Sequence, residues 1–490
     1  MMRPQSNHHP LWVQWAQQNP HQTALVTTHH TYTWQQVSVL VSEYQQQLSH
    51  QGLSEGDVLT IVGKNQAEVT PVYLAALNLG VVCAFTMPQP SLRLKKKLDS
   101  LNQAGQQNYL WLLDSSGIEQ SETVDLNTQL VTLSCLNEVK VDGDDNRITT
   151  SQDSNFNPQN LASIVFTSGS TGNPKAVVHT LQQHLCSALG LLDVFNFEQA
   201  DTWLLSLPMY HVSGLAIVHR WLAAGGCIKI GTGQLETDIE GCSHASLVAT
   251  QLHRLLKSKQ ALTLTHVLLG GSHISEALGL EAQQMGIETW LGYGMTEAAS
   301  TVTAKPVDGT KTAGFVLDHR QLKIEDQRIY IGGNTLASGY YYQGDLTPLV
   351  DDQGWFDSKD LGEWDGEQVS IIGRADNQFI SGGENIHCEE IERALNQLSE
   401  VNQSFIVPIE DDEFGFRPVA IVDCADLPTK EWFAEQLNGR LERFKFPVEY
   451  YRMPKQEQQG IKVSRVGLAQ WLSQHRSKGK RLPRRYLRSC

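Results

Sequence analysis

The sequence has no uninterrupted run of about 18 apolar residues, which is the length that a membrane-spanning helix needs. The most apolar stretch, residues 215–230, is interrupted by His219, Arg220 and Lys229. Residues 1–20 are polar and rich in glutamine, without the apolar segment of a secretory signal peptide. We therefore expect a cytoplasmic protein that does not insert stably into a membrane.

The cysteines also lack a pattern, because no C-x-x-C pair and no metal-ligand spacing occurs among them. This excludes the common cysteine-based zinc motifs and gives no sign of a disulfide framework. A reduced protein with structural thiols is the simplest interpretation. The eight cysteines are at positions 83, 135, 186, 227, 242, 388, 424 and 490.

Positive charge is scarce, since the sequence has 38 Lys and Arg but 53 Asp and Glu, and the formal net charge is −15. Long-range repulsion therefore opposes general binding to nucleic acids or to anionic membranes. Anionic small molecules are not excluded, because local loops can overrule net charge. Residues 476–490 are an exception, with seven Arg or Lys and no acid. This tail is either a solvated end or an attractor of phosphates.

Short Val, Ile and Leu runs alternate with helical patterns up to about residue 370, as in residues 59–62 followed by a helix over 67–79. Such alternation is typical of largely parallel sheets covered on both faces by helices. At about 150 residues per domain, the length indicates two to four domains. Further predicted strands lie at 162–166, 202–206, 247–248 and 266–269.

The pattern changes near Gly373. A helix is predicted over 388–401, strands over 401–407 and 418–423, and a second helix begins at an N-cap, Thr429. We predict an α/β protein with a large N-terminal body, residues 1–373, and a small α+β domain, residues 374–490. The apolar stripe of the second helix is predicted to contain Phe433, Leu437, Leu441 and Phe444.

The strongest local signal is TSGSTGNPK at residues 167–175, which follows an apolar run. Its hydroxyls, glycines and lysine make a loop rich in N–H and O–H donors that can surround phosphate oxygens. Pro174 and Ala176 exclude a Walker A loop, which needs glycine and a hydroxyl residue there. A strand then leads to Thr180, which with Gln183 predicts a capping box. An ordinary surface turn is the alternative for such a loop.

Further segments make the chain resemble the adenylate-forming superfamily, which contains acyl-CoA synthetases, luciferases and peptide-synthetase adenylation domains. YGMTE at 293–297 resembles the family's YGxTE, and GWFDSKDLG at 354–362 resembles its GWxxTGD. GRAD at 373–376, followed by SGGENI at 381–386 and EEIE at 389–392, resembles the hinge and its following loop. The segments occur in the family's order and extend over essentially the whole chain.

The resemblance implies that a carboxylate is joined to AMP with release of pyrophosphate, and that the acyl group then passes to a thiol. Because a carboxylate is a weak nucleophile and both reactants are anionic, the site must supply positive charge at the α-phosphate. The resemblance implies that Glu297 binds Mg²⁺, Thr296 contacts phosphate and Asp360 accepts from the ribose hydroxyls. Taken alone, Glu297 and Asp360 would be solvated surface carboxylates. The implied nucleotide-binding residues are Thr167, Ser168, Gly169, Ser170, Thr171, Gly172, Lys175, Gly271, Gly294, Asp360 and Arg374.

The catalytic cation is predicted near the C-terminus by the same resemblance. Family members usually end in a PKTxxGKxxR-like segment, and residues 454–465 read PKQEQQGIKVSR, with Ile461 between the glycine and the lysine. The spacing to the final arginine favours Lys462, and Lys455 is the other candidate. Such a lysine would bridge the substrate carboxylate and the α-phosphate. An ordinary exposed lysine is the alternative.

A mobile second domain is also implied by the resemblance. Asp376 matches the hinge about which the small domain rotates between the two half-reactions. A rotation of this kind would let one site perform two chemical steps. The loop that then opens a tunnel for CoA is matched by Ser381, Gly382 and Gly383.

The acyl group is predicted to contact residues 207–214, LPMYHVSG, which with RWL at 220–222 match the acyl-pocket segment of aryl- and acyl-CoA ligases. The aspartate of amino-acid-activating members is absent from this stretch. His211 and Ser213 are assigned to the acyl substrate. The combination most resembles members whose substrate has two carboxylates, so Arg220 is the candidate bidentate partner of the non-reacting one. Core packing of His211 and a structural role for Arg220 are the alternatives.

The resemblance thus predicts a ligase that uses Mg²⁺, ATP, CoA and a small carboxylate, without a nucleic-acid partner. The sequence leaves open whether the protein is a homo-oligomer. Another aryl- or acyl-CoA ligase of the same superfamily is one alternative. A non-catalytic protein that retains the nucleotide-binding fold is the other, although the joint presence of Glu297, Asp360, Arg374 and Lys462 argues against it.

Overall fold

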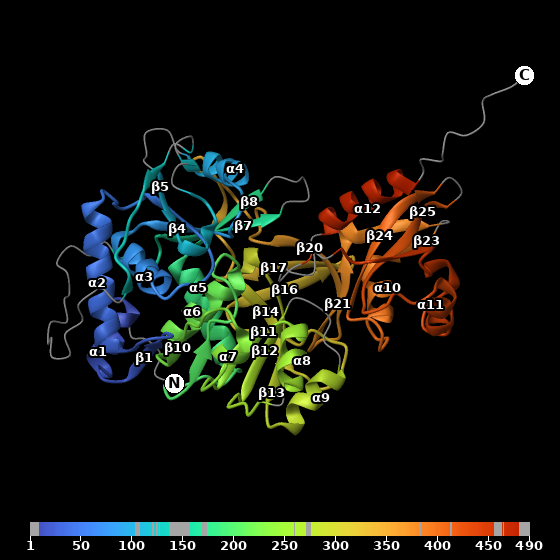
Figure 1. Ribbon diagram of the computed structural model, residues 1–490, viewed down its shortest axis with the longest axis horizontal. Helices are drawn as coiled ribbons and strands as arrows, with labels where there is room; N and C mark the ends of the chain where they lie inside the picture. Colours follow the sequence, from blue (N-terminus) through green and yellow to red (C-terminus); the bar gives the residue numbers. More distant parts are fainter. Residues whose placement is uncertain are drawn as a thin grey trace, which may run out of the picture. The chain divides into compact units, whose positions relative to one another are not determined.

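The structure is a computed structural model in which two compact units can be distinguished (Figure 1). The first unit comprises Met1–Lys323, Tyr330–Asp357 and Asp365–Val369, and the second comprises Ile324–Ile329, Ser358–Trp364 and Ser370–Cys490. Two short segments before residue 370 thus belong to the second unit, which the sequence did not indicate. The description covers residues 9–102, 108–119, 122–123, 126, 128–136, 156–168, 174–258, 260–270, 276–381, 384–411, 414–454, 463 and 465–479.

One sheet of the first unit has eight strands in the order β19-β18-β8-β7-β4-β3-β5-β6. Its central strands are parallel, and every residue of β3 and β4 is buried, as the continuous apolar runs predicted. Strands β7 and β8 form an antiparallel hairpin. The strands are β3 (Val58–Val62), β4 (Val82–Thr86), β5 (Asn108–Leu112), β6 (Gln129–Leu130), β7 (Leu161–Ser168), β8 (Pro174–Thr180), β18 (Gly339–Tyr342) and β19 (Asp345–Thr347).

A second sheet has nine strands in the order β15-β14-β13-β12-β11-β9-β10-β1-β2. Strands β10, β9, β11, β12 and β13 are parallel to one another, which confirms the expected parallel core, whereas β14 is antiparallel to β13. The strands are β1 (Thr23–Val26), β2 (Thr31–Thr33), β9 (Thr202–Leu204), β10 (Cys227–Lys229), β11 (His244–Leu247), β12 (His266–Gly270), β13 (Glu288–Met295), β14 (Ser300–Pro306) and β15 (Phe315–Val316).

Helices pack on these sheets and on one another, with α2 against α3 and α5 against α6. The predicted capping box is confirmed, since Thr180 and Gln183 exchange side-chain and backbone hydrogen bonds at the start of α5. None of the described helices combines the length and apolar character needed to cross a bilayer. They are α1 (Leu11–Gln18), α2 (Trp34–His50), α3 (Val69–Leu79), α4 (Ser91–Leu101), α5 (Leu181–Leu192), α6 (Val212–Ala224), α7 (Leu235–Asp238), α8 (Ala249–Lys257) and α9 (Glu276–Gln284).

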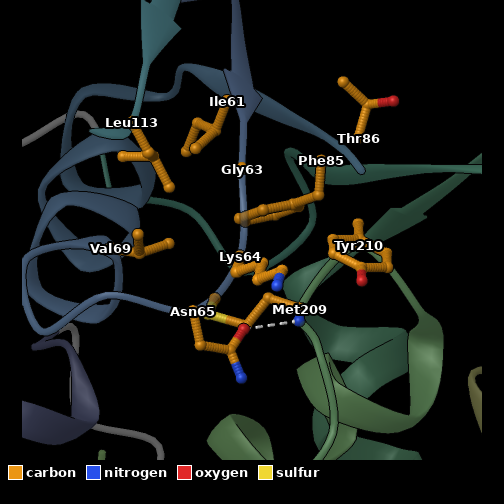
Figure 2. A pocket seen from close by; sticks show the side chains of 10 residues that line it. All are labelled: Ile61, Gly63, Lys64, Asn65, Val69, Phe85, Thr86, Leu113, Met209 and Tyr210. Carbon is orange, nitrogen blue, oxygen red and sulfur yellow. Dashed lines mark hydrogen bonds between the residues drawn. The ribbon is translucent and has the colours of Figure 1, made fainter. Parts of the chain in front are cut away.

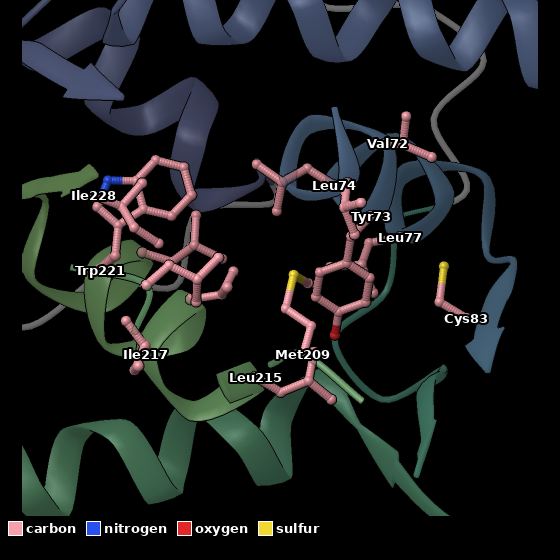
Figure 3. Close-up of a cluster of buried hydrophobic side chains, with 14 of the residues drawn as sticks. Val72, Tyr73, Leu74, Leu77, Cys83, Met209, Leu215, Ile217, Trp221 and Ile228 are labelled. Atoms are coloured by element: carbon pink, nitrogen blue, oxygen red, sulfur yellow. The ribbon is translucent and has the colours of Figure 1, made fainter. Parts of the chain in front are cut away.

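The largest apolar cluster of the first unit joins α3 to α6 (Figure 3). All residues of α3 are buried, so this helix is covered on every side. Burial of side chains of this size contributes about 1.5–3 kcal/mol each, which fixes α6 and the segment before it. The side chains that the two helices contribute include Tyr73, Leu74, Leu77, Leu215, Ile217 and Trp221.

A four-stranded sheet has the order β16-β17-β20-β21, and a five-stranded sheet of the second unit has the order β23-β22-β25-β24 with β26 paired to β25. The latter sheet packs with α10 in an apolar core of its own. The elements are β16 (Arg320–Glu325), β17 (Arg328–Gly333), β20 (Phe356–Trp364), β21 (Val369–Arg374), β22 (Gln378–Ser381), β23 (Glu384–His387), β24 (Gln403–Asp411), β25 (Gly415–Asp423), β26 (Glu449–Arg452), α10 (Cys388–Leu395), α11 (Lys430–Leu437) and α12 (Arg465–Gly479).

Two helices of this unit are shorter than predicted. Helix α10 ends at Leu395, not at residue 401; the next residue, Asn396, is its C-cap, and the Asn396 side chain accepts a hydrogen bond from Ser404 on β24. Helix α11 begins after the predicted N-cap Thr429 but ends at Leu437, where extended Asn438 and left-handed Gly439 (φ +79°) turn the chain.

Leu441 and Phe444 therefore lie beyond α11, contrary to the predicted apolar stripe. Phe433 and Leu437 are fully buried, whereas the Phe444 side chain is 39% exposed. The residues at α-helical spacing were apolar, but a local turn ended the helix before the stripe was complete.

Candidate active site

The predicted phosphate loop connects the two strands of the β7–β8 hairpin. Thr167 is the cross-strand partner of Lys175, so the ends of the loop lie opposite each other. This confirms the predicted strand before the loop and the strand after it. The loop residues Gly169, Ser170, Thr171 and Gly172 and the side chain of Ser168 lie outside the described residues, as does Gly271 of the predicted adenine-side loop.

Tyr340, a residue that the sequence analysis missed, contacts both Lys175 and Glu297. Strand β18 pairs with β8, with Tyr340 opposite Val177. The Lys175 ammonium lies 4.5 Å from the centre of the Tyr340 ring, and the tyrosine hydroxyl donates to Glu297 Oε1 at 3.3 Å. Burial and the nearby carboxylate raise the pKa of Tyr340, which keeps its hydroxyl protonated as a donor.

The YGMTE segment folds as the end of β13 followed by a 3-10 turn, Thr296–Ala298. Gly294 lies against the carbonyl of Ser300, where any Cβ would clash, so only glycine fits here. The Glu297 carbonyl accepts a hydrogen bond from Ala337 N at 2.8 Å, just before β18. Thr296 and Glu297 are half-buried on this turn, so their side chains reach solvent.

Glu297 is the predicted magnesium ligand. Within the described part of the chain, no three His, Cys, Asp or Glu side chains lie together as a metal site. Mg²⁺ is commonly held by one or two carboxylates together with substrate phosphates and water. A single half-buried carboxylate beside the phosphate-loop lysine fits this mode of binding.

In the second unit, Asp360 and Arg374 are paired. Arg374 donates to Asp360 Oδ1 at 3.3 Å and to the carbonyl of Ser358 at 3.1 Å. The Asp360 amide donates to Ser358 Oγ at 3.0 Å, and the Asp360 side chain is only 9% exposed. The paired guanidinium stabilises the charged form of this buried carboxylate, which keeps it as a hydrogen-bond acceptor.

The predicted acyl segment forms the start of α6. His211 is the N-cap residue, its ring packs edge-on against Tyr210 at 4.9 Å, and Ser213 lies half-buried in the first turn. Gly214 lies against the Pro208 carbonyl, where a side chain would not fit. A small hollow opens beside this segment (Figure 2). Its lining residues are Ile61, Gly63, Lys64, Asn65, Val69, Phe85, Thr86, Leu113, Met209 and Tyr210.

Arg220 lies two turns further along α6 and is 1% exposed. Its guanidinium donates to Thr301 Oγ1 at 3.1 Å and lies 5.5 Å from the centre of the Trp203 ring. Burial, and then the charge of Arg320, lower the pKa of Arg220 to about 9. Its Nε atom is buried without a hydrogen-bond partner among the described residues. A buried cation in this state would gain from an anionic partner.

The C-terminal candidates are described only in part. Lys462 and Lys455, with Gly382 and Gly383 of the predicted CoA loop, lie outside the described residues. The backbone of Asp376 lies in the 3-10 turn Ala375–Asn377 directly after β21. Ser381 is buried at the end of β22 and pairs with Glu384 of β23.

Comparison with known proteins gives a family match. The family model for AMP-binding enzymes matches residues 12–341. A 2-succinylbenzoate–CoA ligase of Salmonella typhimurium is 38% identical over 467 residues, which cover 95% of this chain and 98% of the relative. A solved structure of E. coli MenE with bound OSB-AMS has a TM-score of 0.85 at 35% identity and covers 96% of this chain and 100% of that one.

A third similarity concerns the fold alone. The Bacillus subtilis o-succinylbenzoate coenzyme A synthetase, solved in complex with ATP and magnesium ion, has a TM-score of 0.78 at 23% identity. It covers 91% of this chain and 96% of that structure. The predicted α/β class and the resemblance to adenylate-forming enzymes are therefore confirmed, and the chain belongs to the AMP-binding enzyme family.

Proposed function

We propose that this protein is an ATP-dependent acid–thiol ligase that joins 2-succinylbenzoate to CoA, a step of menaquinone biosynthesis. The observation that carries this proposal is the 38% identity to a 2-succinylbenzoate–CoA ligase over 95% of the chain. The segments PMYHVSG at 208–214 and GIKVSR at 460–465 resemble the same ligases. A cytoplasmic location is part of this proposal, because ATP and CoA are both present in the cytoplasm.

In the first half-reaction, a carboxylate oxygen of the acid attacks the α-phosphorus of ATP, and the bond to the bridging oxygen breaks to release pyrophosphate. Backbone and hydroxyl donors of residues 167–175, with Lys175, would bind the phosphates. Glu297 would hold Mg²⁺, which when bound offsets phosphate charge, and Thr296 would contact phosphate. Tyr340 holds the Glu297 carboxylate by its hydrogen bond.

The nucleoside is assigned to the paired carboxylate of the second unit and to the glycines. Asp360, kept charged by Arg374, would accept from both ribose hydroxyls. Gly294 and Gly271 would let the backbone approach the nucleotide closely. Lys462 is the cation proposed to bridge the acid and the α-phosphate during attack.

In the second half-reaction, the thiol of CoA attacks the acyl carbonyl carbon, the thiol proton is lost and AMP leaves as the thioester forms. The proposed rotation about Asp376 would bring the loop that contains Ser381, Gly382 and Gly383 towards the reacting centre. Because the same acyl-adenylate takes part in both steps, it need not leave its site between them.

The acid is assigned to the start of α6. 2-Succinylbenzoate has two carboxylates, of which only one reacts. His211 and Ser213 are proposed to contact the acyl group, and Arg220 to pair with the non-reacting carboxylate, since its buried charge lacks a full set of partners.

The function is tested with a panel of aromatic and aliphatic carboxylates, by following pyrophosphate release and detecting the CoA thioester by mass spectrometry. We expect 2-succinylbenzoate to support both signals at the highest kcat/KM. Higher kcat/KM with another acid would establish the alternative, a different aryl- or acyl-CoA ligase. Absence of ATP–pyrophosphate exchange with every acid would establish a non-catalytic homologue.

Replacement of Arg220 by leucine is expected to lower kcat/KM for 2-succinylbenzoate about 10- to 100-fold, since a charge-assisted hydrogen bond contributes ~1.5–3 kcal/mol. Kinetics with benzoate, which lacks the second carboxylate, should change less than about threefold by the same reasoning. Arg220→Lys keeps the charge but loses the planar fork, so an intermediate loss is expected. Equal losses for both acids, with a lowered Tm, would instead assign Arg220 a structural role.

Replacement of Tyr340 by phenylalanine is expected to raise the Mg²⁺ concentration for half-maximal adenylation about tenfold. The loss of one hydrogen bond to a charged carboxylate, ~1.5 kcal/mol, would leave Glu297 less well held. Titration of MgCl₂ at saturating ATP measures the effect. Tyr342→Phe is the matched control, because Tyr342 is 59% exposed on the same strand. The same shift in both variants would contradict a role for the Tyr340–Glu297 bond.

A further inference from the structure

The segment before α6 is held by hydrogen bonds from Asn65, which lies three residues after the end of β3 and at least 140 residues earlier in the sequence than its partners. Asn65 Nδ2 donates to the carbonyls of Leu205 at 3.2 Å and Leu207 at 2.8 Å. Asn65 Oδ1 accepts from the amide of Met209 at 2.9 Å (Figure 2). One side-chain amide thus satisfies three backbone groups of a five-residue stretch, and its full hydrogen-bonding capacity is about four.

Those backbone groups lie where water is scarce. The side chains of Leu205, Leu207 and Met209 are 5%, 8% and 2% exposed, so this stretch is buried among apolar residues. Pro208 has no N–H and cannot extend a hydrogen-bonded ladder through the segment. A buried carbonyl or amide without a partner is destabilising, so the conformation seen here depends on Asn65.

The backbone between the end of β3 and Asn65 is itself held by hydrogen bonds. The amide of Gly63 donates to Thr86 O at 3.1 Å, and the amide of Lys64 donates to Ser115 Oγ at 2.8 Å. Gly63 has φ +151°, and a Cβ there would lie 2.6 Å from Leu113 Cβ, so the chain leaves β3 in a direction that glycine alone permits. The Asn65 amide is therefore presented from a rigid position.

The segment that Asn65 holds directly precedes the residues of the proposed acyl site in the chain. The stretch 205–209 leads directly into Tyr210 and into His211, the N-cap of α6. Helix α6 then presents Ser213 and Arg220. A shift of the 205–209 backbone would therefore displace all the residues to which the acyl group is assigned, while the phosphate-loop hairpin is built from other strands.

We propose that Asn65 is a positioning residue for the acyl substrate: its amide fixes the 205–209 backbone and thereby places Tyr210 and His211 for binding of the carboxylic acid. It does not contact the reacting atoms. The choice of 2-succinylbenzoate as the acid rests on the proposed function. The three hydrogen bonds from Asn65 to the 205–209 backbone, which we call the clamp, do not depend on it.

The kinetic test compares Asn65→Ala with the wild type. We expect KM for 2-succinylbenzoate to rise at least tenfold, while KM for ATP changes less than twofold. Asn65→Asp has the same shape and still accepts from Met209, but it faces the carbonyls of Leu205 and Leu207 with an oxygen, so KM for the acid should rise here too. If the alanine variant does not accumulate, Asn65→Ser serves as the second truncation.

Asn78→Ala is the matched control. Asn78 is 8% exposed on α3 in the same unit and donates to Gln45 Oε1 at 2.6 Å, so its loss also removes a buried amide. Its hydrogen-bond partner Gln45 lies on α2 and not in the 205–209 stretch. We expect a lowered Tm with KM for the acid within twofold of the wild type. An equal rise of this KM in the control would overturn the positioning role.

Hydrogen–deuterium exchange provides a measurement that needs no substrate. The amide of Met209 should exchange at least tenfold faster in Asn65→Ala than in the wild type, with the amides of β9 unchanged. Unchanged Met209 exchange would overturn the clamp. If the wild type instead fails to activate 2-succinylbenzoate but Met209 exchange responds as expected, the proposed function fails and the clamp stands.

Discussion

Replacement of Lys462 by alanine is expected to abolish formation of the acyl-adenylate while sparing thioester formation from a preformed one. In the proposed mechanism this lysine neutralises charge where the carboxylate attacks the α-phosphate, a repulsive encounter of two anions. Loss of one such preorganised charge costs about 3–4 kcal/mol, or roughly 10²- to 10³-fold in rate. The second half-reaction begins from an acyl-adenylate in which that repulsion has already been overcome.

The two half-reactions are measured separately, by ATP–pyrophosphate exchange and by conversion of synthetic acyl-adenylate to thioester on addition of CoA. Lys455→Ala is the matched control, since Lys455 is the other lysine of the same C-terminal segment. If Lys455→Ala loses exchange and Lys462→Ala keeps it, the extra residue Ile461 has shifted the motif and the assignment passes to Lys455. Equal loss of both half-reactions in Lys462→Ala would show a general structural defect.

The parts of the fold that the sequence predicted are those in which local pattern and tertiary packing agree. Strand β3 is a continuous apolar run and is buried throughout, as a central parallel strand should be. Thr180 and Gln183 form the predicted capping box because both partners lie within one turn of the chain. The ends of α10 and α11 were predicted wrongly, since α10 ends at Leu395 and α11 at Leu437, before their apolar patterns end.

The residues of the candidate site likewise fall into those that the sequence could predict and those that it could not. Motif positions such as Lys175 and Glu297 could be picked from the sequence because the resemblance covers them. Tyr340 and Asn65 could not, because their roles come from contacts between segments far apart in the chain. No local pattern indicates that β18 pairs with β8, or that Asn65 forms hydrogen bonds with the segment before α6. Such contacts follow from sheet order, which a single sequence does not fix.

The stability of the first unit is expected to fall steeply below pH 6.5, because a column of three histidines is buried in its core. The ring of His184 stacks on His219 at 4.1 Å and lies 4.7 Å from His179. Ser163 Oγ lies 2.7 Å from His184 Nε2, and Tyr73 Oη lies 3.1 Å from His219 Nε2. All three rings are at most 1% exposed, so a proton added to any of them would be poorly solvated.

Burial lowers the pKa of His179 and of His219 from 6.5 to about 3, and with its two histidine neighbours it lowers the pKa of His184 well below 6.5. Well above pH 6.5 the rings are neutral in both the folded and the unfolded chain, so they add no pH dependence. As the pH falls through 6.5, the unfolded chain takes up protons that the buried rings of the folded chain do not, and the free energy of unfolding falls by up to ~1.4 kcal/mol per pH unit for each histidine.

From pH 6.5 to 5.5 protonation of the three histidines in the unfolded chain should therefore lower the free energy of unfolding by about 3 kcal/mol, a large part of the 5–15 kcal/mol typical of a folded domain. Urea unfolding followed by tryptophan fluorescence at both pH values measures the loss. His184→Gln removes one titrating ring, so the difference between the two pH values should shrink by ~1 kcal/mol. His253→Gln is the control, because His253 is exposed on α8 and should leave the difference unchanged. A pH dependence that is the same in the wild type and in His184→Gln would show that the column is protonated in the folded state.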